Sequence, residues 1–192
     1  MHRLSTSFVL GYHGCDRVLG ESLLAGKSRF LLSENDYDWL GPGVYFWEAN
    51  PHRALEFAQE KKARRQAVQD PFVVGAVIDL GLCLDLTTKD SIDDLRIAFE
   101  SLVETFRVRG VQLPENGSGP TFWMRYLDCA VIRRLHEIIE DSHSTPIDTV
   151  RGIFQEGEPA YPGSAFLEKT HLQIAVTNLD CIKAVFRVTD NK

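Results

Sequence analysis

One continuous apolar run, residues 72–80, constrains the fold more than any other feature of this chain. It reads Phe-Val-Val-Gly-Ala-Val-Ile-Asp-Leu. A short unbroken apolar run rich in β-branched residues is typical of a buried strand. Shorter strand candidates lie at 8–13, 44–47, 82–86, 150–154, 172–176 and 182–188. We therefore expect a sheet whose strands come mainly from the two ends of the chain.

Helix signals occupy the middle of the sequence. Asn50 is a good N-cap and Pro51 suits a first helical position, with Ala54, Phe57 and Ala58 forming an apolar face. Ser91 is the expected cap of a second helix, and residues 121–140 carry the apolar stripe of a third. Residues 22–32 fit a short helix followed by a strand. This order lacks regular βαβ repeats and predicts an α+β fold, with residues 1–192 forming a single domain.

Composition places the chain among globular proteins. Of its 192 residues 44% are hydrophobic, and the formal net charge of -6 does not favour a protein that binds the nucleic-acid backbone as its main task. Neither a secretory signal nor an apolar run of about 20 residues is visible, so we expect a soluble, cytoplasmic protein without a membrane partner.

Cysteine and histidine spacing bears on metal chemistry. The four cysteines lie far apart, and the six histidines show no ligand spacing, so no metal is expected. Cys83, Cys129 and Cys181 lie in apolar runs and are interpreted as buried thiols.

Basic residues gather in one place, at Lys61, Lys62, Arg64 and Arg65. Such a run is usually a solvated helix face. The alternative is a contact for a phosphate-bearing partner.

Three segments combine residues suited to ligand chemistry. The first, residues 11–15, places His13 and Gly14 at the end of an apolar strand. The second is Gly-Pro-Gly-Val-Tyr-Phe-Trp-Glu at 41–48, which places Tyr45 on a short strand that leads into the following helix. The third is a Gly/Pro-rich loop at 155–165 before a strand that carries Gln173. Each has an ordinary structural reading as a turn, a core aromatic or an edge-strand polar residue.

Together these segments resemble the ADP-ribosyltransferase superfamily, on the poly(ADP-ribose) polymerase and diphtheria-toxin side. That family carries an early strand ending in His-Gly, then Gly-x-Gly-[Ile/Val]-Tyr-Phe leading into a helix, then a late strand with a Glu or a substitute. The matches here are His13-Gly14, residues 41–46 and Gln173. The resemblance implies the family's split mixed sheet flanked by helices. Residues 81–149 match no part of it.

The resemblance also implies roles in binding NAD, the co-substrate. His13 would hydrogen-bond a ribose hydroxyl, and the backbone of Gly14 would hold the nicotinamide carboxamide. Tyr45 would stack on the nicotinamide ring beside Gly43, helped by Phe57. Gln173 would lie near the ribose, where oxocarbenium-like positive charge develops as the glycosidic bond breaks.

Gln173 departs from the glutamate of polymerising members. A neutral amide orients a hydroxyl but does not offset a cation, which favours transfer of a single ADP-ribose. Another carboxylate could supply the charge. Glu48 is the first candidate, and it could equally be a surface charge; the other candidates are Glu156, Glu158 and Glu168.

The acceptor is expected to be a macromolecule, either protein or nucleic acid. In the resembling family the loop before the late strand recognises it, which makes Tyr161 a candidate substrate contact. By analogy, a small single-domain form fits a bacterial toxin or defence effector, with an antitoxin as a further partner.

Two other functions remain open at the level of sequence. An NAD glycohydrolase would use the same pocket with water in place of the acceptor. A non-catalytic module that binds NAD or ADP-ribose would keep the pocket but lack the negative charge that catalysis needs.

Overall fold

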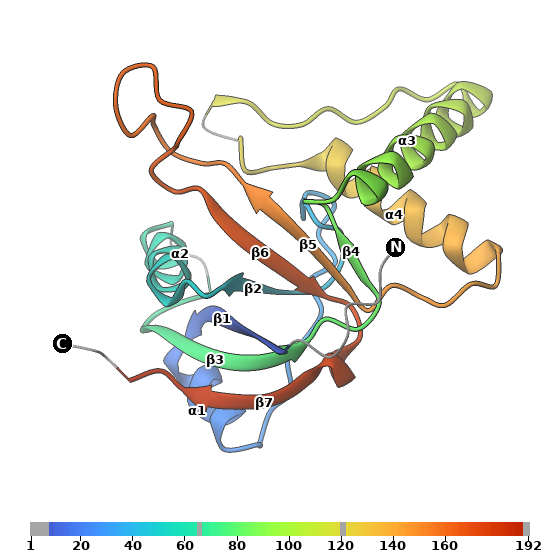
Figure 1. The fold of residues 1–192 in the computed structure, drawn as a ribbon. Coiled ribbons are helices and arrows are strands. Elements are labelled where there is room, and N and C mark those ends of the chain that lie inside the picture. The colour runs from blue at the N-terminus through green and yellow to red at the C-terminus, as the bar shows by residue number, and fades with distance from the viewer. Residues whose placement is uncertain (1–7, 65–66, 120–121, 190–192) are drawn as a thin grey trace.

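The computed structural model describes residues 8–64, 67–119 and 122–189. Seven strands and four α-helices follow one another in a mixed order (Figure 1). They are β1 (Phe8–Asp16), α1 (Arg17–Leu24), β2 (Val44–Glu48), α2 (Pro51–Ala63), β3 (Pro71–Asp79), β4 (Cys83–Asp85), α3 (Lys89–Arg109), α4 (Tyr126–Asp141), β5 (Thr149–Phe154), β6 (His171–Val176) and β7 (Ile182–Arg187). The expected α+β class is confirmed.

All seven strands join one sheet in the order β4-β5-β6-β2-β1-β3-β7. Every pairing is antiparallel except that of β4 with β5. The run at 72–80 forms β3, one residue earlier than expected, and lies between β1 and β7. Its near-continuous burial follows from strands on both sides and packing on both faces.

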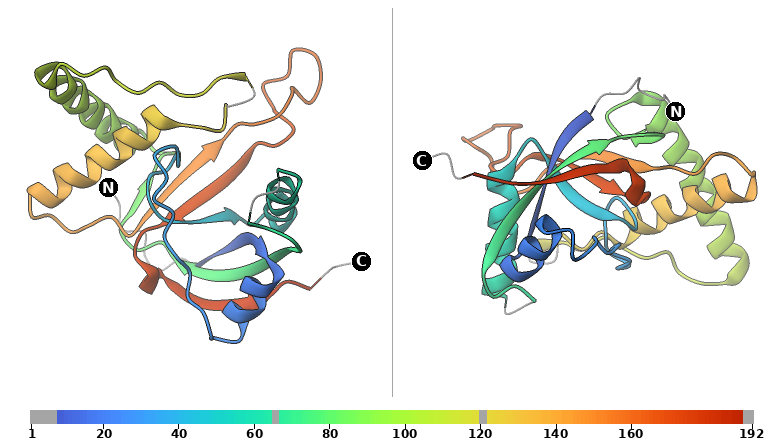
Figure 2. Two further views of the ribbon diagram at one scale, coloured as in Figure 1. Left: turned by 180° about the vertical axis from the view of Figure 1, so that it is seen from behind. Right: turned by 90° about the horizontal axis from the view of Figure 1, so that it is seen from below.

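The two faces of the sheet carry separate hydrophobic clusters, because neighbouring residues in a strand point to opposite faces. Phe46 of β2 belongs to a cluster with Val74, Ile78 and Ile174, which α1 covers with Leu23. Tyr45 packs on the other face, against a cluster that includes Leu135 of α4 and Leu102 of α3. Helices α3 and α4 stand over the β4–β5 end of the sheet, and α2 lies over β1 and β3 (Figures 1 and 2).

Helix α2 approaches β1 closely because Gly14 has no side chain. A Cβ at Gly14 would lie 2.0 Å from the carbonyl oxygen of Ala54. The Asn50 side chain accepts a hydrogen bond from the Arg53 backbone N–H, and Pro51 opens the helix, as expected. Together these contacts fix the helix that carries one wall of the site described below.

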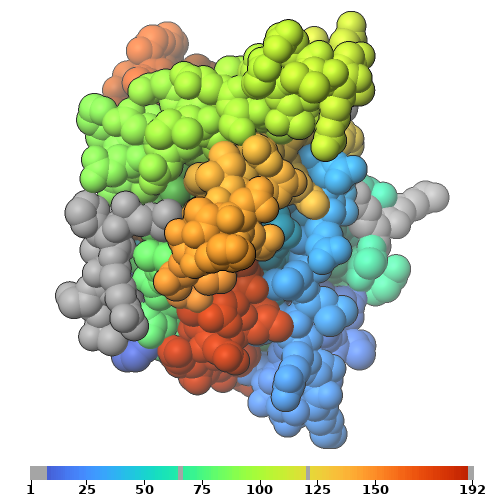
Figure 3. Space-filling view, turned by 90° about the vertical axis from the view of Figure 1, so that its right-hand side faces the viewer, coloured from blue at the N-terminus to red at the C-terminus, as the bar shows by residue number. Residues whose placement is uncertain are grey.

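The N-cap of helix α3 lies three residues before the cap that the sequence predicted. Thr88 is the N-cap, and its side chain accepts from the backbone N–H of Ser91, while Ser91 itself is buried. The prediction of Ser91 was wrong because two cap-forming residues lie one turn apart, and the Thr88 hydroxyl is fixed by the Asp85 carbonyl as the chain leaves β4. Helix α4 lies between α3 and the segment 30–40 (Figure 3).

The segment 22–32 differs from its prediction. The helix there is α1, which ends at Leu24. In place of the expected strand, the described residues show an isolated bridge between Ser33 and Gly43. The four cysteines are free and buried, including the three that we expected to be. Over the described ranges, a helix long and apolar enough to cross a membrane does not occur.

Candidate functional site

A cavity of about 230 Å³ opens between α2, the segment 31–39 and the inner strands of the sheet. It brings together residues from all three sequence motifs: His13, then Gly43 and Tyr45, then Gln173. Phe57 of α2 also lines it. Side chains separated by up to 160 positions in the sequence therefore share one pocket.

His13 lies where β1 and β2 part. Among the β1 residues, Gly11 and Tyr12 pair with β2. After Tyr12 the backbone pairing stops, and the His13 side chain contacts β2 instead, with Nδ1 2.8 Å from the Tyr45 carbonyl oxygen. A carbonyl only accepts, so Nδ1 carries the proton and Nε2 keeps a lone pair. Burial lowers the pKa of His13 to about 4. The ring is therefore neutral at pH 7 and offers an acceptor.

Tyr45 is held by its hydroxyl to the loop that precedes its own strand. The hydroxyl donates to the Gly41 carbonyl at 2.7 Å and accepts from the Leu40 N–H at 3.0 Å. Burial raises the pKa of the Tyr45 phenol well above its usual value, so the group stays neutral. Because its hydroxyl is bonded to the backbone, the part of Tyr45 that remains to contact a ligand in the cavity is its ring.

Gln173 of β6 has its amide orientation set by Trp39. The indole Nε1–H of Trp39 donates to the Gln173 side chain at 2.6 Å. An indole N–H is a donor only, so the atom facing it is the amide oxygen, and the NH₂ group is left to act as a donor elsewhere. Gly152, opposite Gln173 on β5, makes room for the indole, since a Cβ there would lie 2.9 Å from the Trp39 ring.

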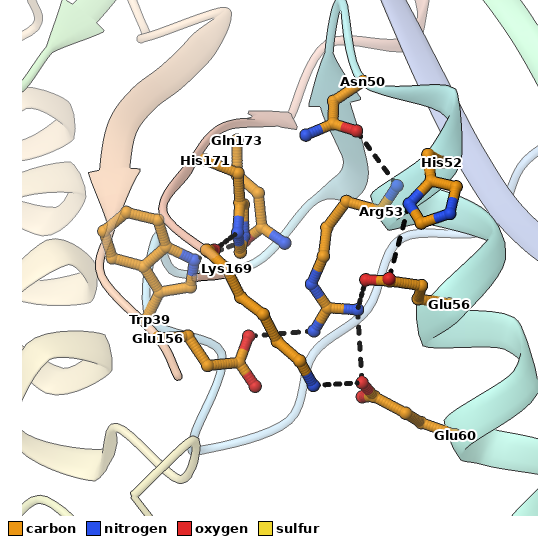
Figure 4. A network of polar contacts seen from close by, with 10 residues as sticks. All are labelled: Trp39, Asn50, His52, Arg53, Glu56, Glu60, Glu156, Lys169, His171 and Gln173. Atoms are coloured by element: carbon orange, nitrogen blue, oxygen red, sulfur yellow. Dashed lines mark hydrogen bonds and ion pairs between the residues drawn. The ribbon is translucent and has the colours of Figure 1, made fainter. Parts of the chain in front are cut away.

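A buried arginine of α2 forms the centre of a charged network on the opposite wall (Figure 4). Arg53 is 5% exposed, and its Nη2 donates to Glu156 at 2.8 Å. Its Nη1 lies 3.3 Å from Glu60, which also accepts from Lys169 at 3.0 Å. Glu156 and Lys169 flank the loop between β5 and β6, so these ion pairs tie both ends of that loop to α2.

Four polar atoms buried in or near this network have no hydrogen-bond partner among the described residues. They are Nε1 of Trp47, Nε and Nη1 of Arg53, and Nε2 of His171; Nη1 makes ion-pair contacts only. The Nδ1–H of His171 donates to the Lys169 carbonyl at 2.5 Å, so Nε2 is an acceptor in the neutral ring, and burial lowers the pKa of His171. Unpaired buried polar atoms cost free energy. All three residues line the cavity, where a polar ligand would pair them.

The basic run divides between the cavity and the solvent. Lys61 lies over the Phe57 ring at 4.5 Å, and burial lowers the pKa of this lysine. Arg64 lies over the Trp123 ring at 5.2 Å, and both residues line the cavity mouth. Lys62 is exposed, and Arg65 falls outside the described residues.

Some predicted residues lie outside the cavity. Glu48 points to the other face of β2 and accepts from Arg151 at 2.5 and 3.0 Å. Tyr161 is 58% exposed on the β5–β6 loop. The space above Gly14, expected to admit a ligand, is filled by the Ala54 carbonyl, so a ligand would have to reach this glycine from elsewhere.

Among the candidate glutamates, Glu156 is the one that lines the cavity. Glu158 and Glu168 are exposed. Sequence reasoning missed Arg53, Trp39 and His171 as site residues. A signal existed for Arg53, which precedes Phe57 by four residues and so shares its helix face.

Comparisons with known proteins add one relative. The chain is 24% identical over 191 residues to an uncharacterized protein of Methanocaldococcus jannaschii, an alignment that covers 90% of this chain and 83% of the relative. No family model matches the chain. No solved structure matches it either.

Proposed function

We propose that this protein is an NAD-dependent mono-ADP-ribosyltransferase with the split-sheet fold of that superfamily. The observation that carries the proposal is the shared cavity of His13, Tyr45 and Gln173, three residues whose motifs match the superfamily separately in sequence. The parting of β1 and β2 beyond Tyr12 opens the sheet at the place where the cavity lies. Both features support the proposal independently of the overall α+β class.

The cavity is suited to one end of the dinucleotide. Binding pockets for small molecules usually measure about 300–1,000 Å³. A volume of about 230 Å³ fits the nicotinamide and its ribose, with the remainder of NAD lying across the open mouth. Nicotinamide would stack on the Tyr45 ring beside Gly43 and Phe57. The Nε2 lone pair of His13 would accept from a ribose hydroxyl.

The reaction breaks the bond between the ribose C1′ and the nicotinamide nitrogen, and the bonding pair leaves with neutral nicotinamide. C1′ then bonds to an oxygen or nitrogen of the acceptor, which loses its proton. The positive charge that develops on the ribose needs a nearby negative group. Gln173 cannot supply it, and it presents an NH₂ donor. In this proposal Gln173 orients a ribose hydroxyl.

We assign to Glu156 the role of the negative group that stabilises the positive charge on the ribose. Glu156 lines the cavity just beyond the end of β5, where its backbone carbonyl accepts from the Lys169 N–H at 2.9 Å, and Arg53 holds its carboxylate in place. The same carboxylate would take the proton of the acceptor. Glu48, the first candidate from the sequence, is engaged by Arg151 on the other face of the sheet. The neutral amide of Gln173, at the place where polymerising members carry a glutamate, favours one transfer over chain elongation.

The test uses purified protein with NAD labelled on its adenylate moiety, with and without a cell lysate. Free nicotinamide and label in macromolecules are measured for the wild type and for His13→Ala, Gln173→Ala and Glu156→Gln. Glu158→Gln is the matched control, since Glu158 is an exposed glutamate of the same loop. We expect nicotinamide release and macromolecular label to fall in the three cavity variants and to stay unchanged in the control.

The outcomes separate the remaining functions. Nicotinamide with only free ADP-ribose would identify an NAD glycohydrolase. Saturable NAD binding without nicotinamide would identify a binding module. Equal rates for Glu156→Gln and wild type would overturn the role of Glu156.

A further inference from the structure

A second hollow adjoins the cavity on the side of the β5–β6 loop. It measures about 470 Å³ and shares Trp39 and Phe154 with the first cavity. Its other walls come from Phe122 and Arg125, which precede α4, from Asp128 of α4, and from Ile153 and Gln155 of β5 and its end. Because Trp39 is bonded to Gln173, a molecule in this hollow lies within one side chain of the proposed reaction centre.

Two ring contacts and one step along the chain connect this hollow to the basic end of α2. Arg64 lies over Trp123, whose neighbour in the chain is Phe122. The centroid of the Phe122 ring is 5.7 Å from that of Phe154, which is 4.9 Å from that of Trp39. We call these four rings, Trp123, Phe122, Phe154 and Trp39, the aromatic strip. It runs from a cation at one end to Gln173 at the other.

Cations lie beside two of the four rings of the aromatic strip, Trp123 and Phe122. The Arg125 guanidinium lies 5.3 Å from the centroid of Phe122, while Nε also bonds Asp128 at 2.8 Å. Lys61 and Arg64 stand at the far end. Phe122 is 38% exposed and Ile153 52%, so apolar surface is open to a partner.

We propose that the acceptor is a single-stranded nucleic acid that lies along the aromatic strip, with the modified nucleotide beside Gln173. Stacking rings interleaved with arginine and lysine are how proteins bind unpaired bases and their phosphates. Bases in a duplex are stacked inside it and do not reach such a hollow. The inference rests on the proposed function. In the transfer, an oxygen or nitrogen of the nucleotide bonds to C1′, its proton passes to Glu156, and nicotinamide leaves.

The overall charge of -6 is compatible with this proposal because the cations are local. A protein acceptor with acidic and aromatic side chains would use the same cations and rings. The two acceptors are therefore distinguished by where the label is found, in an oligonucleotide or in lysate protein.

Binding is measured first, without NAD, by fluorescence anisotropy of a labelled single-stranded RNA and a labelled single-stranded DNA of mixed sequence. Phe122→Ala should weaken binding by roughly 5- to 150-fold, the range of one lost base stack. Phe99→Ala is the matched control, since Phe99 is also 38% exposed but lies on α3. Arg64→Gln should weaken binding and flatten its salt dependence, by about 0.7 in the log–log slope for one phosphate contact. Arg109→Gln, at the end of α3, is its control.

Transfer is measured next, with adenylate-labelled NAD and the same oligonucleotides. Label in the oligonucleotide, lost in Phe122→Ala and kept in Phe99→Ala, is the expected result. Absence of oligonucleotide binding, equal binding of a duplex, or label found only in lysate protein would overturn the inference. Nicotinamide release together with any of these three results leaves the proposed function standing and removes only the nucleic-acid acceptor. Oligonucleotide binding without nicotinamide release keeps the docking surface and removes the transferase.

Discussion

The Nε1–H of Trp39 donates to the Oε1 of Gln173 at 2.6 Å, and this bond decides which way the Gln173 amide faces. The two residues lie 134 positions apart. Trp39 comes from an irregular segment and Gln173 from a central strand, so the strand supplies the amide and the segment supplies its orientation.

The substitution Trp39→Phe tests this orientation. It removes the N–H and keeps an aromatic ring against Phe154. We expect nicotinamide release to fall by roughly tenfold, the scale of one hydrogen bond of about 1.4 kcal/mol. Combining it with Gln173→Ala should give little further loss, because the two residues act as one unit. Losses that multiply independently in the double variant would show that Trp39 does not act through Gln173.

The hydroxyl and the ring of Tyr45 have different expected roles. Tyr45→Phe leaves the buried Leu40 N–H and Gly41 carbonyl without their partner, and should lower the free energy of unfolding by about 1–3 kcal/mol. It keeps the ring, so nicotinamide release should stay near that of the wild type. Tyr45→Ala should reduce release by roughly tenfold through loss of the stacking contact. Chemical denaturation and the nicotinamide assay measure the two effects. A Tyr45→Phe variant as inactive as Tyr45→Ala would assign the role to the hydroxyl.

Gly14→Ala should displace α2. The new Cβ would lie 2.0 Å from the Ala54 carbonyl oxygen, which is backbone and can yield only if the helix moves. We expect unfolding free energy to drop by about 3 kcal/mol, the upper range for overpacking. Affinity for NAD should fall as well, because α2 carries Phe57. A stable variant with unchanged NAD affinity, measured by calorimetry, would contradict the close approach described here.

Stability should decline on mild acidification. The pKa of His13 is about 4 in the folded protein against 6.5 in the unfolded chain, so between these values the unfolded chain binds more protons. Folding stability from this residue is therefore full above pH 6.5, is lost as the pH falls, and levels off below pH 4. The loss by pH 5 is about 2 kcal/mol at 1.36 kcal/mol per pKa unit.

Burial also lowers the pKa of His136 and His171, which adds to the effect with the same sign. The comparison is therefore made between wild type and His13→Asn, by urea unfolding at pH 7 and pH 5. The variant should lose about 2 kcal/mol less. An equal loss in both proteins would show that His13 titrates normally.

The regular elements were predictable because their residues obey local rules. Asn50 and Pro51 mark the start of α2 by side-chain and backbone geometry that depends on neighbours alone. The β-branched run of β3 and the alternation of Tyr45, Phe46 and Trp47 likewise follow from local pattern. The N-cap of α3 shows the limit of local rules. Thr88 and Ser91 are both suitable caps, and the hydrogen bond from the Thr88 hydroxyl to the Asp85 carbonyl selects Thr88.

The site was predictable only where a motif named it. His13, Tyr45 and Gln173 came from the family resemblance, and their common cavity required the fold. Trp39 was missed because it lies in a segment without periodicity, and its partner Gln173 lies 134 residues later in the chain. Glu48 and Glu156 look alike in sequence. The fold distinguishes them: Glu48 lies on the face of β2 that is turned away from the cavity, and Glu156, beyond the end of β5, lines the cavity.

The four buried cysteines can be used to detect local unfolding of the protein. Burial raises the pKa of Cys15, Cys83 and Cys181 to about 11 each, so their thiols are both covered and unreactive in the native state. Cys129 lies on α4, while the others lie in or beside the sheet. An alkylating reagent would therefore react only with molecules that have locally unfolded, and the order in which the sites become labelled would reveal whether the helical layer or the sheet gives way first.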